Sequence, residues 1–215
     1  LPEKKYISIV IPLVLFMALF FTWNYNRNQE SNYIDVDTQY NRVLIFETKD
    51  RNTDRPIKML RVNDENSSAM FLDSDDGLVF KVLQYYHLIE HFVPDFENSL
   101  MIGGSGYAFP KAYLKSYPEA NLDVVEIDPG LTALAKKHFE LKDDPRLKIF
   151  HEDGRIFLNH CAEKKYDAVF MDAYKSMLTI PYQLTTQEAI QKISYALTEN
   201  GAVFANVISS LDNKT

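Results

Sequence analysis

The sequence has little cysteine, no excess of positive charge and no phosphate-binding loop. Only one of its 215 residues is cysteine, which excludes an intrachain disulfide and any site built from several thiolates. Its net charge of -7 at pH 7 argues against nucleic-acid binding, because that function depends on basic surfaces that neutralise phosphate. No GK[ST] follows the glycine-rich segment, so we do not expect a nucleoside triphosphatase.

Metal-ligand patterns are also sparse. His87 and His91 lie four residues apart in a helical pattern, a spacing at which two imidazoles can share a metal ion. No third ligand follows them in a recognisable pattern, and the single cysteine, Cys161, is expected to be a small buried residue. We therefore predict a protein without a metal ion.

One long apolar run stands near the start. Residues 6–23 read YISIVIPLVLFMALFFTW and carry no charge, and a helix needs about 20 apolar residues to cross a bilayer. We therefore predict a transmembrane helix within residues 1–25, in which Pro12 is tolerated. A cleaved signal peptide and a buried soluble helix are the alternatives, although no small-x-small cleavage site follows Trp23.

The predicted span makes this a membrane-anchored protein, and we expect its catalytic domain in the cytoplasm. The basic residues before the run favour the opposite orientation by the positive-inside rule, unless earlier spans decide. Because the chain begins with leucine and stops soon after a strand-like run, we interpret it as part of a longer protein with an incomplete carboxyl-terminal domain.

A polar linker and a small β element follow the apolar run. Residues 26–39 are predicted to be the linker, and residues 40–77 the β element. Within the latter, residues 41–48 and 57–62 have the alternating, β-branched character of a hairpin, and a third short strand is expected at residues 69–72.

Strands and helices alternate through residues 78–215. The first helical pattern covers residues 78–92, and beyond it the apolar runs SLMIG, LDVVEID, LKIFHED, YDAVFMD and AVFANV alternate with amphipathic segments. This order predicts right-handed βαβ crossovers, hence a doubly wound α/β domain over residues 96–207 with a parallel sheet covered on both faces. Ligands on such sheets bind at the carboxyl ends of the strands.

The first two strands end in residues suited to a nucleoside. Gly103, Gly104 and Ser105 form a glycine-rich turn at which the backbone can approach a ligand closely, although a tight strand-to-helix turn needs no ligand. Glu126, followed by Ile127, comes 20 positions after Gly106, about the distance at which an acidic residue accepts hydrogen bonds from ribose hydroxyls.

The next two strands end in acids. Asp153 and Gly154 suit an adenine contact, with the carboxylate accepting from the amino group, although Asp153 can equally cap a helix. Asp172 lies where a reactive sulfonium would be held, and can orient or deprotonate an attacking amine. Phe109 stands where a dinucleotide fingerprint would have its third glycine, which favours an adenosyl-sulfonium ligand over NAD.

Taken together, the segments YNRVLIFET, DSDDGLVFKVLQYYHL, MIGGSGYAFPKAYL, VVEIDPGLTALAKKHF, LKIFHEDGRIFL and YDAVFMDAY resemble the spermidine synthase (polyamine aminopropyltransferase) family over roughly residues 40–207. The resemblance implies a small β domain leading into a Rossmann-like domain of the class I methyltransferase type. It implies transfer of an aminopropyl group from decarboxylated S-adenosylmethionine to a diamine in polyamine biosynthesis. The implied roles are a glycine turn at Gly103 and Gly104, a ribose carboxylate at Glu126, an adenine contact at Asp153 and Gly154, and a catalytic aspartate at Asp172.

The departures from the family pattern concern the acceptor side. The family's glycine loop usually carries an aspartate, which is missing from Ser105-Gly106-Tyr107. A second aspartate usually follows the catalytic one by three residues, and here that position is Lys175, next to Tyr174. The usual tyrosine-glutamine or tyrosine-glutamate pair is replaced by Phe80-Lys81. Two lysines would repel a dicationic substrate, so the nucleoside half looks kept and the half that binds the acceptor looks altered. The predicted acceptor contacts are Phe80, Lys81, Tyr174 and Lys175.

Three functions are therefore compared. The first is a spermidine-synthase-like transferase that moves an aminopropyl group to a small-molecule amine. The second is a methyltransferase that uses intact S-adenosylmethionine, with Lys81 or Lys175 pairing with a carboxylate. The third is a non-catalytic, membrane-attached domain that binds an adenosyl ligand. Family members commonly dimerise, so a homodimer is a further expectation.

Overall fold

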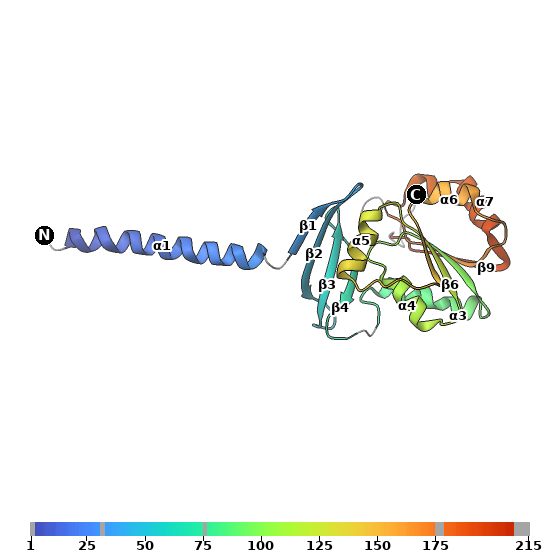
Figure 1. Ribbon diagram of the computed structural model, residues 1–215, viewed down its shortest axis with the longest axis horizontal. Helices are drawn as coiled ribbons and strands as arrows, with labels where there is room; N and C mark the ends of the chain where they lie inside the picture. Colours follow the sequence, from blue (N-terminus) through green and yellow to red (C-terminus); the bar gives the residue numbers. More distant parts are fainter. Residues whose placement is uncertain (1–2, 31–32, 75–76, 175–178, 209–215) are drawn as a thin grey trace, which may run out of the picture. The chain divides into compact units, whose positions relative to one another are not determined.

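The computed structural model describes residues 3–30, 33–74, 77–174 and 179–208, which form two units, residues 1–34 and residues 35–215. Figure 1 shows the elements in chain order. The helices are α1 (Glu3–Glu30), α2 (Lys81–Gln84), α3 (Ile89–Phe92), α4 (Ala108–Ser116), α5 (Pro129–His138), α6 (Gly154–His160) and α7 (Gln187–Ala196), with 3-10 turns η1 (Tyr85–Leu88) and η2 (Tyr182–Leu184). The strands are β1 (Tyr33–Asp37), β2 (Arg42–Lys49), β3 (Pro56–Val62), β4 (Glu65–Phe71), β5 (Asn98–Ile102), β6 (Asn121–Val125), β7 (Leu147–Phe150), β8 (Tyr166–Met171) and β9 (Leu197–Ala205).

The first unit is dominated by α1, and it corrects one prediction. Among the residues described, no helix combines the length and the apolar character that a membrane crossing requires. A helix that crosses a bilayer needs about 20 consecutive apolar residues. The prediction of a transmembrane helix at residues 6–23, and the membrane anchoring inferred from it, are therefore wrong.

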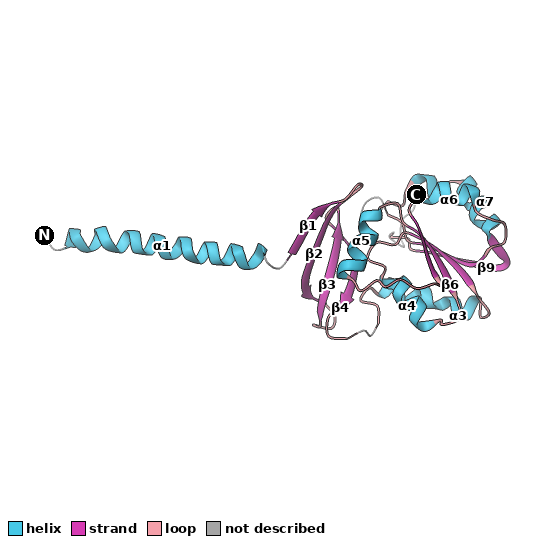
Figure 2. Ribbon diagram, viewed as in Figure 1, coloured by secondary structure: helices cyan, strands magenta, loops and turns pink. Residues whose placement is uncertain are grey.

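A four-stranded sheet opens the second part of the structure, and Figure 2 shows it as a group of strands separate from the parallel sheet. Its order is β1-β2-β3-β4, with β2 antiparallel to β3 and β3 antiparallel to β4. The hairpin strands expected at residues 41–48 and 57–62 are present as β2 and β3. Residues 33–37, expected to lie in the linker, instead form β1.

The parallel sheet has the order β7-β6-β5-β8-β9, and every neighbouring pair is parallel. Counted along the chain from β5, this is the order 3-2-1-4-5 of a doubly wound Rossmann-like fold. The predicted α/β architecture is thus confirmed. The strand order reverses between β5 and β8, and a crevice at the carboxyl ends of these two strands is the expected ligand site.

Alternate residues of the central strands build the two faces of the core. Met101 and Phe170 pack with the residues of η1, α3 and α4, whereas Ile102 and Met171 pack with those of α6 and α7. This follows from the two-residue period of a strand. Figure 1 shows α3 and α4 on one side of the sheet and α6 and α7 on the other.

The segment expected as one helix over residues 78–92 is broken into α2, η1 and α3. Its middle, Tyr85-Tyr86-His87, consists of residues with modest helix propensity. The Tyr86 ring packs against both Phe109 and Phe170, with ring centroids 5.0 and 5.2 Å away. The packing of this ring therefore outweighs helical continuity here.

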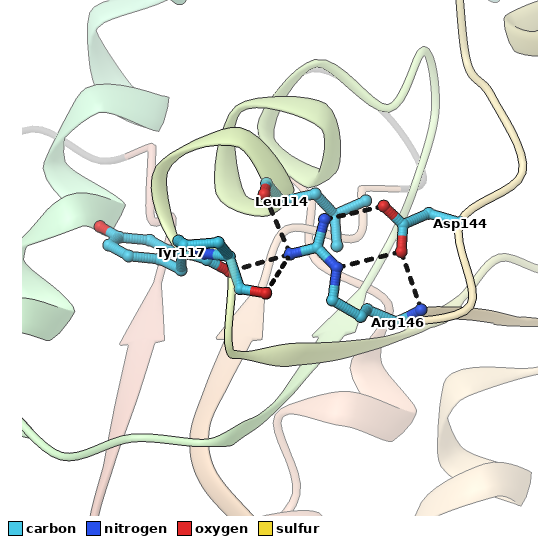
Figure 3. Close-up of polar contacts among 5 residues, drawn as sticks. Leu114, Tyr117, Asp144 and Arg146 are labelled. Atoms are coloured by element: carbon cyan, nitrogen blue, oxygen red, sulfur yellow. Dashed lines mark hydrogen bonds and ion pairs between the residues drawn. The ribbon is translucent and has the colours of Figure 1, made fainter.

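Arg146, just before β7, ties the end of α4 to the sheet (Figure 3). Its Nη1 donates to the carbonyls of Leu114, Tyr117 and Pro118 at 3.1, 3.0 and 3.1 Å, and its Nη2 donates to Asp144 at 2.8 Å. These carbonyls lie at or just beyond the last turn of α4, where carbonyl groups have no N–H donor within the helix. The arginine therefore anchors the connection from α4 to β6.

The four-stranded sheet packs on the α/β domain through apolar and polar contacts. Val43, Ile45 and Leu60 form one buried cluster with Leu131 and Phe139. Polar contacts with the start of α5 and with the glycine turn join the same two parts.

Candidate functional site

The glycine turn after β5 is held in a strained, closely packed conformation. Gly103 has φ +100°, and Ser105 and Tyr107 have φ +47° and +56°, in the left-handed region. A Cβ added to Gly103 would lie 2.5 Å from the Asp172 carbonyl oxygen. Only glycine fits there, so the turn after β5 and the tip of β8 lie in direct contact at the point where the strand order reverses.

Glu126, at the end of β6, holds this turn with its carboxylate. Its Oε2 accepts hydrogen bonds from the backbone N–H groups of Gly104 and Ser105 at 2.8 and 2.9 Å, and its Oε1 accepts from the N–H of Asp128 at 2.9 Å. The residue is only 6% exposed. The predicted ribose contact stays a prediction, and the capacity left on Oε1 is what a hydroxyl would use. Ile127 is 39% exposed at the same edge.

Asp128, which the sequence did not single out, joins the four-stranded sheet to α5. It is fully buried, caps α5 by accepting from the Gly130 N–H at 2.9 Å, and accepts from Asn41 Nδ2 at 2.7 Å and from the Thr38 hydroxyl. At the glycine turn, the Ser67 and Ser105 hydroxyls are 2.8 Å apart. The four-stranded sheet therefore contacts both the glycine turn and the start of α5.

Asp153 caps α6, which is the alternative considered from the sequence. Its Oδ1 accepts from the N–H groups of Arg155 and Ile156 at 2.7 and 3.2 Å, and its Oδ2 accepts from Gln183 Nε2 at 3.2 Å. Gly154 packs so tightly that a Cβ would lie 2.6 Å from Ile102 Cγ2. Its smallness thus serves the packing of α6 on β5. The adenine contact of both residues remains a prediction.

Asp172 lies at the tip of β8, and its environment differs from those of the other acids. Its backbone N–H donates to the Ile102 carbonyl at 2.9 Å, and its Oδ1 accepts from Asn206 Nδ2 at 2.9 Å. Burial raises the pKa of the carboxyl to about 6, partly offset by the hydrogen bond from Asn206 and by the nearby Tyr86 hydroxyl. The group stays mostly ionised at pH 7, yet it is a stronger base than an ordinary aspartate.

The predicted acceptor contacts are only partly brought together. The Tyr174 hydroxyl donates to the Asn206 carbonyl at 2.6 Å, and burial near Asp172 raises its pKa. Phe80 packs against the core, and Lys81 is exposed at the start of α2. Lys175 lies outside the described residues.

Two residues near Asp172 were missed by sequence reasoning. Asn206 directly follows β9, so the rule that placed Asp172 at a strand tip would have found it if applied to the fifth strand. Tyr86 is 3% exposed and faces Asp172 closely enough to affect the carboxyl's pKa. No sequence signal points to Tyr86, because its place depends on the break in the helix.

Within the described part of the chain, no three His, Cys, Asp or Glu side chains are grouped so that they could hold a metal ion. His87 instead uses Nδ1 for a 2.5 Å hydrogen bond with the Tyr117 hydroxyl, which also donates to Glu90 at 2.8 Å. The His91 ring packs edge-on against that of Phe92.

Comparisons with known proteins point to one family. The sequence pattern of the spermine/spermidine synthase domain matches residues 82–211. A polyamine aminopropyltransferase of Vibrio vulnificus is 31% identical over 121 residues, covering 55% of this chain and 40% of that protein. A probable polyamine aminopropyl transferase of Bifidobacterium longum is 26% identical over 218 residues, covering 95% of this chain and 44% of that protein. The chain thus spans less than half the length of these relatives.

The solved structures support the same fold. A probable spermidine synthase from Corynebacterium glutamicum superposes with a TM-score of 0.69 at 22% identity, covering 81% of this chain and 63% of that one. A spermidine synthase in complex with the transition-state analogue AdoDATO gives a TM-score of 0.62 at 20% identity, covering 81% and 57%.

Proposed function

Because the chain belongs to the spermine/spermidine synthase family, we propose that it transfers an aminopropyl group from decarboxylated S-adenosylmethionine to a small-molecule amine. The observation that carries this proposal is the position of Asp172. It lies against the glycine turn where the strand order reverses, with its pKa raised to about 6. A base of this kind, placed beside the reacting carbon, is what alkylation of an amine requires.

The nucleoside half of the site fits the donor in chemistry. Glu126 retains acceptor capacity for ribose hydroxyls, and the exposed Ile127 offers an apolar surface to an adenine ring. Asp153 and Gly154 lie at the next strand tip. The Asp172 carboxylate supplies the negative charge that a sulfonium favours.

The donor supplies an electrophilic carbon bonded to sulfur. Asp172 holds the acceptor amine so that its nitrogen lone pair points at that carbon, and proximity of this kind accounts for much of the rate. As the C–N bond forms, the C–S bonding electrons leave with sulfur as a neutral thioether. The new ammonium then releases one proton to Asp172.

Methyl transfer from intact S-adenosylmethionine is the second candidate. It is favoured by Lys81, which is exposed at the start of α2 where the family resemblance expects an amide or a carboxylate. A lysine there would pair with the carboxylate that only the intact donor carries. The same lysine would repel a dicationic acceptor.

The test combines calorimetry and turnover on the 215-residue chain. Titration with decarboxylated and intact S-adenosylmethionine should show tighter binding of the decarboxylated form, and putrescine should be converted to a product carrying an aminopropyl group. Asp172→Asn should lower turnover by about 10²- to 10⁴-fold while donor affinity stays within a few fold. Asp167→Asn, at the opposite end of the same strand, is the matched control and should retain turnover.

Tighter binding of the intact donor, with methylated product, would favour the second candidate. Donor binding without turnover of any amine would point to a non-catalytic binding domain. Either result would reject aminopropyl transfer as the activity of this chain.

A further inference from the structure

Asn206 is fixed to the tip of β8 by three hydrogen bonds. Its backbone N–H donates to the Met171 carbonyl at 3.0 Å, its carbonyl accepts from the Tyr174 hydroxyl at 2.6 Å, and its Nδ2 donates to Asp172 Oδ1 at 2.9 Å. The backbone and the side chain of Asn206 are thus both fixed by hydrogen bonds. Because an amide N–H cannot accept a proton, Oδ1 receives a donor whatever the charge on Asp172.

Tyr86 approaches the same carboxyl from η1. Its side chain is 3% exposed, and its hydroxyl has no partner at hydrogen-bonding geometry among the described residues. Its ring nevertheless packs 5.2 Å from that of Phe170, two residues before Asp172, and the hydroxyl and the Asp172 carboxyl each shift the pKa of the other. A buried hydroxyl without a partner is costly, so such a group in a folded protein calls for an explanation.

We propose that Asn206 and Tyr86 are positioning residues that direct proton transfer to Oδ2 of Asp172. Asn206 keeps Oδ1 occupied, so the proton released by the acceptor nitrogen goes to Oδ2. Tyr86 adjusts to either state, because a hydroxyl can donate to a carboxylate and accept from a carboxylic acid. No group is oxidised or reduced in this step. The assignment rests on the proposed function, in which Asp172 accepts that proton.

The other groups around Asp172 are consistent with this arrangement. Among the described residues, the titratable side chains that interact with it are Tyr86 and Tyr174, and burial raises the pKa of both phenols. Both therefore stay neutral where Asp172 titrates. Its pKa is then set by burial, against which act the Asn206 amide that hydrogen-bonds to it and the neutral Tyr86 hydroxyl nearby.

The test measures the Asp172 pKa directly and needs no turnover. The 215-residue chain is labelled with ¹³C at aspartate carboxyls, the carboxyl shifts are followed against pH by NMR, and the Asp172→Asn spectrum identifies the signal. Tyr86→Phe keeps the ring packing and should raise the pKa by about half a unit to one unit, because a donor to the charged form is lost. Asn206→Leu should raise it by about one unit, and Asn206→Asp by more, because a second carboxylate disfavours ionisation.

Tyr113→Phe is the matched control. Tyr113 is a fully buried tyrosine whose ring also packs near Phe170, but its hydroxyl donates to Ser99 at 2.9 Å. This variant should leave the Asp172 pKa unchanged. An Asp172 pKa that stays within about 0.2 units in both Tyr86→Phe and Asn206→Leu would overturn the positioning roles.

The pH profile of turnover separates this inference from the proposed function. If the wild-type chain turns over amines, its acid limb should follow the measured Asp172 pKa and move upward in the Tyr86 and Asn206 variants. Shifted pKa values without turnover in the wild type would support the positioning roles and reject the proposed function. Turnover of amines by the wild type, with Asp172 pKa values that do not shift in the variants, would support the proposed function and reject the positioning roles.

Discussion

Glu126 and Asp172 both lie at the carboxyl edge of the parallel sheet, at the ends of the two strands that flank β5, and they differ in how their oxygens are satisfied. Glu126 accepts three backbone N–H groups. Asp172 accepts one side-chain amide, and burial raises its pKa to about 6. The first carboxylate organises the glycine turn, whereas the second has, among the described residues, a hydrogen bond to Oδ1 alone. At this edge, hydrogen-bond saturation distinguishes a supporting carboxylate from the one to which we assign the proton transfer.

Glu126→Gln is the strongest way to test the supporting role. A glutamine side chain has one carbonyl oxygen and one amide NH₂ group. At least one of the three backbone N–H groups would therefore face the NH₂ group, which is itself a donor. We expect the free energy of unfolding in urea to fall by about 3 kcal/mol. Glu119→Gln, on an exposed residue, should change it by less than about 0.5 kcal/mol. A loss equal to that of the control would mean that Glu126 does not hold the turn.

Asp172→Asn should have the opposite effect and raise the free energy of unfolding. Because the folded-state pKa of Asp172 is raised above its usual value of 3.8 to about 6, the folded state binds the proton more tightly than the unfolded state. Wild-type stability is therefore lost as the pH rises from about 4 to about 6. At pH 8 the asparagine variant should be more stable by about 3 kcal/mol, and the difference should shrink toward zero near pH 4.

Urea unfolding of both proteins at several pH values measures this difference. Asp143→Asn, on an exposed carboxylate paired with Lys136, is the control and should differ from the wild type by less than about 0.5 kcal/mol. A variant that is less stable than the wild type at pH 8 would contradict the contrast with Glu126.

Thr38→Val gives the smallest expected effect. It removes one donor from the buried Asp128, which keeps its bonds from Asn41 and Gly130. A partly satisfied carboxylate should lose about 1 kcal/mol of unfolding free energy. Thr48→Val, in the exposed part of β2, is the control and should be near neutral. A loss above about 3 kcal/mol would show that Asp128 resembles Glu126 in depending on every donor.

The parallel sheet and its strand-tip residues could be predicted because they depend on local pattern. Short apolar runs mark the strands, and the carboxyl ends of parallel strands meet at one edge, which brings Gly103 and Asp172 together. The partners of Asp172 depend on packing. Tyr86 reaches it only because η1 interrupts a segment whose periodicity predicts a continuous helix. Composition alone also gave too much weight to residues 6–23, the predicted membrane span that was wrong.

Asp153 shows the limit of reading roles from strand tips. The same position suits an adenine contact and a helix cap, and the structure shows the cap. An acid before a helix meets its first backbone N–H groups whether or not a ligand is present. Sequence order can therefore place such a residue at the site without deciding what it binds.

The four-stranded sheet is linked to the glycine turn by the contact between the Ser67 and Ser105 hydroxyls, and to the start of α5 by the bonds from Thr38 and Asn41 to Asp128. Docking of the sheet and ordering of the turn are therefore coupled. A molecule that binds the ordered turn must then also favour the docked sheet, by the same coupling free energy with which the docked sheet favours that molecule. Slower amide hydrogen exchange in β4 on ligand binding would be the signature of this reciprocity. A sheet that carries no reacting group would thereby contribute to affinity at the glycine turn.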